Sequence, residues 1–264
     1  HRVAWSLVVM VVLTVALRRT SQLRAILRNP RVLALLTVAS AVIGLTWGGC
    51  IWGVNNGRVV EVSLGYFINP LVTVLLGVGV LKERLRPTQW VAMGIAGLAV
   101  VGLTVDYGHP PWIAFLLAGS FGTYGLAKKT AGVEAVESLT FETLVLLPLA
   151  LGYLVWLWTQ DTANFGAHGA LHALLLTTTG LVTAVPLICF GAAAIRVSMT
   201  TIGLLQYLAP SIQFALGLLV FHEDMTPVKW AGFALVWLAL AIFTAEALRH
   251  RGRQLRLAAE ASAV

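Results

Sequence analysis

Polar side chains interrupt long apolar runs at two related places. Asn69 stands directly before Pro70, and Gln206 with Tyr207 stands shortly before Pro210. A proline inside a helix leaves one backbone carbonyl without its amide partner and bends the helix. Two such bends with amide side chains beside them are typical of the place where a transporter binds a small solute. The alternative is that the prolines only shape helix packing, and the residues leave both interpretations open.

Other polar and aromatic side chains lie nearer the ends of the apolar runs. Asn55 and Asn56 close one run, where they would cap a helix or line an entrance, and we favour the cap. Tryptophans usually anchor a helix at the membrane interface. Trp47 and Trp52 flank two glycines that allow close approach, so we keep them as candidates for a solute pathway. Tyr66 completes that set of pathway candidates.

A carboxylate, Glu142, begins the segment ETLVLLP inside another apolar run. Near a helix start the macrodipole favours a carboxylate, which then stays in water. The sharper alternative is a protonatable group that couples proton entry to solute export. Glu61 and Gln213 are weaker candidates of the same kind. Arg2, with His1 before it, would meet an anionic group or extend to the membrane surface.

Neither a catalytic pattern nor a cofactor pattern is present in the sequence. Cys50 and Cys189 both lie in apolar runs and have neither a disulfide framework nor metal-site spacing. His168 and His172 are four residues apart, and we expect a solvated pair there rather than a metal site. Phosphate-binding loops and hydrolase motifs are absent as well. We therefore expect no enzyme activity, no cofactor and no metal.

The composition shows what kind of elements must position these residues. Of 264 residues, 58% are hydrophobic and 11% are charged, whereas soluble domains carry about 25% charged residues. We therefore expect an all-α integral membrane protein, a polytopic helical bundle. Each span needs about 20 apolar residues. The nine expected helices are Val3–Leu17, Val32–Val54, Val60–Leu81, Trp90–Val105, Trp112–Ala127, Leu139–Trp158, Leu171–Ile195, Thr200–Phe221 and Val228–Leu248, followed by a polar tail.

The two halves of the chain repeat one another. The residue pairs Pro70 and Pro210, Glu83 and Glu223, and Trp90 and Trp230 are each 140 residues apart. Gly65 and Gly203 are only 138 apart, so the second copy has two extra residues before its proline. Because nine helices divide unevenly, we expect a tenth before His1 and two five-helix repeats. Residues 1–107 would be the first repeat, 108–248 the second and 249–264 a basic tail.

The distribution of lysine and arginine fixes an orientation. The segment Leu17–Arg31 carries five arginines and is therefore placed in the cytoplasm. If successive helices cross the membrane in alternating directions, all of the 18 basic residues except Arg2, Arg58 and Lys229 lie on the cytoplasmic side. The same alternation also puts the carboxyl terminus inside. Glu83 falls at the inner end of its helix and Glu223 at the outer end, so the two repeats would be inverted.

A proline-centred helix, a loop glutamate and a helix that begins at tryptophan together resemble the EamA repeat of the drug/metabolite transporter superfamily. Within that family the whole chain is similar to the bacterial RarD permeases. The segments that carry the resemblance are HRVAWS (1–6), IWGVNNGRVVEVSLGYFINPL (51–71), KERLRPTQW (82–90), ETLVLLP (142–148), VPLICFGAAA (185–194) and LQYLAP (205–210). The resemblance implies ten helices, cytoplasmic termini and a permease of the bacterial inner membrane. It also implies that the chain is related to exporters of amino acids and metabolites, and to proteins named for chloramphenicol sensitivity.

The function expected from these observations is secondary transport of a small organic solute, by alternating access between the two repeats. The solute and the lipid bilayer are the expected partners, nucleic acid is not, and a homodimer is left open. The alternative functions are a membrane scaffold that transports nothing and a membrane-embedded enzyme. An enzyme would need clustered histidine, aspartate or cysteine within a span, and a scaffold has no need of matched, bent helices.

Overall fold

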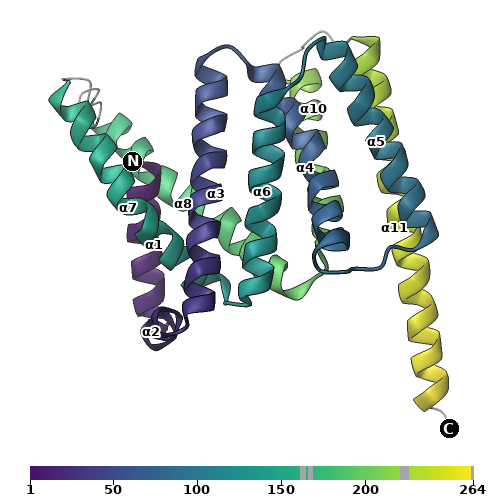
Figure 1. Cartoon of the computed structure of the whole chain (residues 1–264), viewed down its shortest axis with the longest axis horizontal. Coiled ribbons are helices and arrows are strands. Elements are labelled where there is room, and N and C mark those ends of the chain that lie inside the picture. Colours follow the sequence, from purple (N-terminus) through teal and green to yellow (C-terminus); the bar gives the residue numbers. More distant parts are fainter. Residues whose placement is uncertain (161–164, 166–168, 221–225, 263–264) are drawn as a thin grey trace. The chain divides into compact units, whose positions relative to one another are not determined.

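The described part of the protein is built from α-helices (Figure 1). A computed structural model describes residues 1–160, 165, 169–220 and 226–262, and these residues form no strand. Glu223 and His168 lie outside the described residues. The helices are α1 Arg2–Ala16, α2 Thr20–Arg28, α3 Pro30–Asn55, α4 Val59–Gly79, α5 Pro87–Tyr107, α6 Trp112–Ala131, α7 Ala135–Thr159, α8 Gly169–Arg196, α9 Met199–Leu205, α10 Leu208–Leu219 and α11 Pro227–Ser262.

Five described helices are long and apolar enough to cross a membrane: α3, α4, α5, α7 and α8. A sixth span is added if α1 and α2, bent by 110° at their junction, count as one. In α11 the apolar part, Trp230–Glu246, is shorter than these spans. The described residues therefore form a multi-pass helical membrane protein, and the count of nine or ten spans stays a prediction.

Helical structure occurs in two segments where none was expected. Helix α2 lies in the segment predicted as a basic loop, because Leu23, Ile26 and Leu27 share one face of it. Ile26 is buried in a cluster with Leu36 and Phe141. Helix α11 continues through the predicted polar tail to Ser262, and the tail is rich in leucine, alanine and arginine, which favour helix.

The predicted span from Thr200 to Phe221 is broken. Helix α9 ends at Leu205 and α10 begins at Leu208, with a turn at Gln206 and Tyr207. A proline ring clashes with the carbonyl four residues earlier, which for Pro210 is Gln206. The two inserted residues of the second repeat fall in this same stretch. Helix α4, which lacks the insertion, runs unbroken through Pro70.

The chain divides into two compact units that we describe separately. Unit 1 contains residues His1–Gly48 and Thr123–Ser198, and unit 2 contains Gly49–Gly122 and Met199–Val264. Helices α3 and α6 each begin in one unit and end in the other. Both units combine segments from the two halves of the sequence, so they are not the predicted repeats, which stay a prediction.

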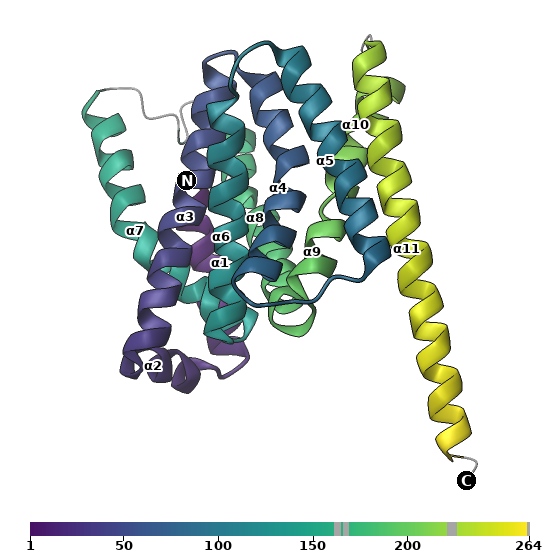
Figure 2. The same cartoon turned by 45° about the vertical axis from the view of Figure 1, so that its right-hand side comes forward.

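Unit 2 is built around pairs of antiparallel helices. Helices α5 and α11 lie side by side and run in opposite directions, as do α4 and the α9–α10 pair (Figures 1 and 2). Phe214 and Phe233 lie at the centre, with ring centroids 4.0 Å apart, and Phe67 packs edge-on against Phe233 at 4.9 Å. Helix α5 begins at Pro87, and Gly108 caps its carboxyl end with a φ of +82°, which suits glycine.

In unit 1, α1 packs against α7 and α8. Helix α8 approaches α1 so closely at Gly180 that a Cβ there would lie 2.4 Å from the carbonyl carbon of Trp5. Farther along α1, the hydroxyls of Thr14 and Thr140 are 2.9 Å apart and join it to α7. Small and hydroxyl-bearing residues allow and tie such close helix contacts in membranes.

Candidate functional site

The amide side chains beside the two prolines meet in unit 2. Asn69 Nδ2 and Thr73 Oγ1 of α4 each donate a hydrogen bond of 3.2 Å to Gln206 Oε1, in the turn between α9 and α10. Three other buried atoms have no hydrogen-bond partner among the described residues: Asn69 Oδ1, Gln206 Nε2 and Tyr207 Oη. Buried polar atoms are nearly always paired. The cluster therefore offers an acceptor, a donor and a hydroxyl to a ligand or to water.

The close approach of α9 to α4 positions this cluster. A Cβ at Gly203 would lie 2.7 Å from the backbone oxygen of Pro70, so only glycine fits there without a shift. Pro70 and Tyr207 also line a void of about 10 Å³, which is close to the space of one water molecule. Pro70 therefore contributes to the site in two ways: its backbone oxygen faces Gly203, and the residue lines this void.

A carboxylate that sequence reasoning assigned to a loop fixes the start of α9. Glu83 follows α4, and its oxygens accept hydrogen bonds from the backbone N–H groups of Met199 (2.7 Å) and Thr200 (3.0 Å). The Thr200 hydroxyl donates a third bond of 2.7 Å. Glu83 therefore caps a helix that begins more than 100 residues later, and no local sequence signal reveals this contact.

A larger cavity of about 670 Å³ lies in unit 2 among α3, α4, α5, α10 and α11. Tyr66 and Pro210 of the predicted pathway line it, together with Gln213. Its other notable lining residues are Ser63, Phe67, Asp106, Tyr107, Phe214 and Phe233. Asn69 follows Tyr66 by three residues, on the same side of α4. The volume lies within the range typical of small-molecule sites, about 300–1,000 Å³.

The remaining pathway candidates lie outside this group. Asn55 is exposed at the end of α3, and Asn56 Nδ2 donates to the carbonyl oxygen of Trp52 at 2.8 Å. The Trp52 ring is 5.6 Å from the Arg58 guanidinium in unit 2. Trp47 belongs to unit 1. The two tryptophans therefore belong to different units, and the structure does not show a binding site that both rings would line.

Two charged residues, Arg2 at the start of α1 and Glu61 in the first turn of α4, have defined partners. Arg2 Nε donates to Thr183 Oγ1 at 2.7 Å, and its guanidinium lies 4.7 Å from the Trp47 ring. The carboxylate of Glu61 accepts a 2.7 Å bond from the backbone N–H of Ile113. It also accepts a bond from the hydroxyl of Tyr107. Glu61 therefore holds the start of α6 to α4.

Glu142 is buried in unit 1 rather than solvated. Its carboxylate pairs with the ammonium of Lys128 at 2.7 Å, and both side chains are 1% exposed. The hydroxyls of Tyr124 and Ser138 also donate to it, at 2.9 and 2.7 Å. The charge pattern had placed Lys128 among the basic residues at the membrane surface. Sequence reasoning therefore missed it as the partner of Glu142.

Comparison with known proteins agrees with these features. The model of the EamA-like transporter family matches residues 2–105. A protein RarD of Streptomyces exfoliatus is 56% identical over 263 residues, covering 100% of this chain and 83% of that protein. The protein RarD of Escherichia coli (strain K12) is 42% identical over 253 residues, covering 96% and 86%. One crystal structure, at 18% identity and a TM-score of 0.53, covers 94% of this chain and 96% of that chain, and this likeness shows the fold alone.

These relatives match the chain across both units, so the family assignment does not depend on the amino-terminal half alone. The apolar helices agree with it. The chain belongs to the EamA-like transporter family, as a RarD-like permease of the drug/metabolite transporter type that crosses the membrane several times, and it is not an enzyme.

Proposed function

We propose that this permease carries a small organic solute across the bacterial inner membrane, and that unit 2 holds the solute. The observation that carries the proposal is the set of buried polar atoms left unpaired at the break between α9 and α10. Leaving such groups unpaired in an apolar interior costs on the order of 1–3 kcal/mol each. A solute with its own donor and acceptor groups would remove that cost.

The cavity beside this cluster supports the same assignment. It combines aromatic walls, from Phe67, Phe214 and Phe233, with the polar groups of Ser63 and Gln213. Sites for small organic molecules are typically apolar with a few placed polar groups. Tyr66 lines the cavity, and Asn69 lies one turn farther along α4. A solute against the aromatic side chains would therefore lie close to Asn69 and its partner Gln206.

Alternating access is the transport mechanism that we propose. Within unit 2 the repeat-related helices, α4 with α9–α10 and α5 with α11, run in opposite directions (Figure 1). Opposite directions are what an inverted duplication requires, and such transporters expose a central site to each side in turn. The break at Gln206 would allow α9 and α10 to move relative to each other, whereas α4 is continuous.

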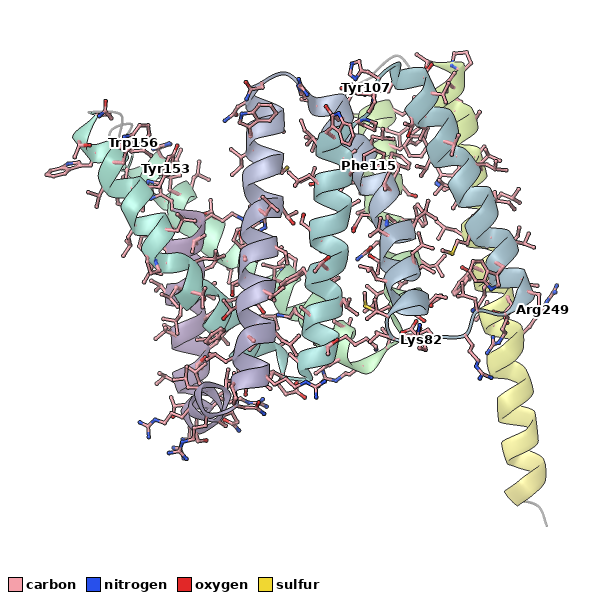
Figure 3. The ribbon with its side chains drawn as sticks, in the orientation of Figure 1. Lys82, Tyr107, Phe115, Tyr153, Trp156 and Arg249 are labelled. Carbon is pink, nitrogen blue, oxygen red and sulfur yellow. The ribbon has the colours of Figure 1, made fainter. Side chains whose placement is uncertain are left out.

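The proposed orientation puts the carboxyl-terminal end of α11 in the cytoplasm. In Figure 3, Lys82 and Arg249 lie at a similar level in the lower part of unit 2, with α11 continuing beyond Arg249, while Tyr107 and Phe115 lie in its upper part. The part with Lys82 and Arg249 also carries Arg84 and Arg86. Lysine and arginine gather on the cytoplasmic side of membrane proteins.

Counterflow in proteoliposomes tests the proposal. Vesicles loaded with unlabelled chloramphenicol, or with one unlabelled amino acid, are diluted into the same solute carrying a label. We expect protein-dependent exchange for at least one solute of this panel, and loss of most of it in the double variant Asn69→Ala/Gln206→Ala. The matched control is Asn55→Ala/Asn56→Ala, at the exposed end of α3. Equal exchange in both double variants would place the solute elsewhere. An absence of exchange across the panel and a wider metabolite set would favour a membrane scaffold.

A further inference from the structure

A buried ion pair joins α6 to α7 in unit 1, and the proposed solute site does not use it. Lys128 Nζ donates to Glu142 Oε1 at 2.7 Å and to Ser138 Oγ at 2.9 Å. Ser138 in turn donates to Glu142 Oε1, and Tyr124 donates to Oε2. The carboxylate therefore accepts three hydrogen bonds, one of them from an ammonium. Charge-assisted bonds of this kind are shorter and stronger than neutral ones.

Neighbouring elements leave space for this pair, and among the described residues no second salt bridge joins it. A Cβ at Gly191 of α8 would lie 2.9 Å from Lys128 Cε, so glycine makes room for the lysine. The Phe190 ring of α8 stacks on Tyr124, with centroids 5.7 Å apart. The other charged side chains of these elements have partners of their own: Arg19 pairs with Glu137, Arg196 pairs with Glu134, and Lys129 donates to the carbonyl oxygens of Ala194 and Val197.

Burial makes each charge depend on the other. Removing one partner from a buried pair leaves an uncompensated charge, a change that is strongly destabilising. If α6 and α7 move apart during transport, at least one of the two groups must change its protonation state or reach water.

The two partners differ in how well they can keep a charge alone. Lys128 lies in the last turn of α6, where the free carbonyl groups of a helix end favour a cation. Glu142 is the eighth residue of α7, beyond the first turn in which a helix start favours an anion. If the pair separated, a change of protonation would therefore fall on Glu142, which would take a proton from the solvent onto a carboxylate oxygen and return it to the solvent when the pair closes.

We infer that Glu142 is a proton-binding site of this transporter, which is empty while Lys128 pairs with it and filled when the pair opens. Resting on the proposed function, this would couple solute movement to a proton gradient. Glu137 is the competing site, because its buried Oε2 has no partner among the described residues. Its Oε1 is held by Arg19.

Infrared titration of the reconstituted full chain tests proton binding directly. On acidification we expect the wild-type protein to gain the carbonyl absorption of a buried carboxylic acid. We expect Glu142→Gln to lose that absorption and Glu137→Gln to keep it. Glu134→Gln, an exposed glutamate in a surface pair with Arg196, is the matched control. Loss of the band in Glu137→Gln with retention in Glu142→Gln would overturn the assignment.

A second variant keeps the test decisive if Glu142→Gln does not fold. Replacing a buried pair by apolar residues is often neutral for stability, so Lys128→Met/Glu142→Leu should be produced as a folded protein. We expect it too to lack the band, and a band of wild-type size in it would also overturn the assignment.

A transport measurement separates coupling from transport itself. The readout is the ratio of labelled chloramphenicol or amino-acid exchange with and without a pH step across the vesicle membrane. We expect a ratio above one for the wild type and a ratio of one for Lys128→Met/Glu142→Leu. Equal ratios would make the pair purely structural. If no solute of the panel exchanges in the wild type, the proposed function fails, while the infrared titration still decides the proton site.

Discussion

Glu83 holds the backbone of Met199, 116 residues away in the sequence, through a hydrogen bond of 2.7 Å from the Met199 N–H. The first amides of a helix have no partner within it, and a carboxylate beside them satisfies those donors and complements the helix dipole. Helix α9 has only seven residues, so the bond made at its start determines much of its position. Because α9 ends at Leu205, directly before Gln206, Glu83 fixes one end of the element that leads into the proposed solute site.

We therefore expect Glu83→Ala to loosen the start of α9, at a cost of about 1–2 kcal/mol as for other lost helix caps. Amide hydrogen exchange at Met199 and Thr200 should accelerate, and Glu83→Gln should lie between alanine and the wild type because its carbonyl still accepts. Glu134→Ala, in an exposed pair, serves as the control and should leave these amides unchanged. Wild-type exchange in Glu83→Ala would show that the bond does not hold α9.

The contact between α4 and α9 predicts a sharp difference between two glycines. A Cβ at Gly203 would meet the backbone oxygen of Pro70 at 2.7 Å, whereas Gly94 of α5 has open space around it. Gly203→Ala must push two helix backbones apart, so we expect a loss of about 1–3 kcal/mol, the range for overpacked positions. Gly94→Ala should be neutral or slightly stabilising. Thermal unfolding in detergent compares the two variants, and equal midpoints would contradict the close approach.

Several of these features could be predicted from the sequence. The spacing of the repeats places Asn69 and Gln206 beside matching prolines, and the structure brings these two side chains together. The change of spacing from 138 to 140 residues also marks the place where the second helix breaks. The break itself was not predicted, because a proline inside a membrane helix is compatible with either a bend or an interruption.

Other features depend on tertiary contacts that no local pattern records. Lys128 looked like a surface lysine because positive charge usually gathers at the membrane face, yet Glu142 and the space above Gly191 allow it to be buried. Helix α2 was missed because five arginines in and around it dominate its composition. Its apolar face becomes apparent only when Leu36 and Phe141 are known to lie against it.

The contact between the first turn of α1 and α8 can be measured by a double-mutant cycle. Arg2 Nε donates to Thr183 Oγ1 at 2.7 Å, so Arg2→Ala and Thr183→Val should each destabilise unit 1. Their effects should fall short of additivity by about 1 kcal/mol, the usual net value of a hydrogen bond. Arg24→Ala, on the exposed side of α2, should combine additively with Thr183→Val. Additive behaviour of the Arg2 and Thr183 variants would mean that the bond contributes nothing.

Cysteine labelling tests the proposed orientation. The background carries Cys50→Ala and Cys189→Ala, and single cysteines replace Lys82, His109 or Arg249. In unit 2, Lys82 and Arg249 lie at a similar level in the lower part of the view, and His109 follows Tyr107, which lies in the upper part (Figure 3). An impermeant maleimide added to intact cells should label the cysteine at 109 and spare those at 82 and 249 until the cells are opened, because the ends rich in lysine and arginine face the cytoplasm. Labelling of 82 and 249 from outside, with protection of 109, would invert the orientation. Labelling of 82 and 109 from the same side would mean that α5 does not cross the membrane, and the inverted pairing of α5 with α11 would then fail as a basis for alternating access.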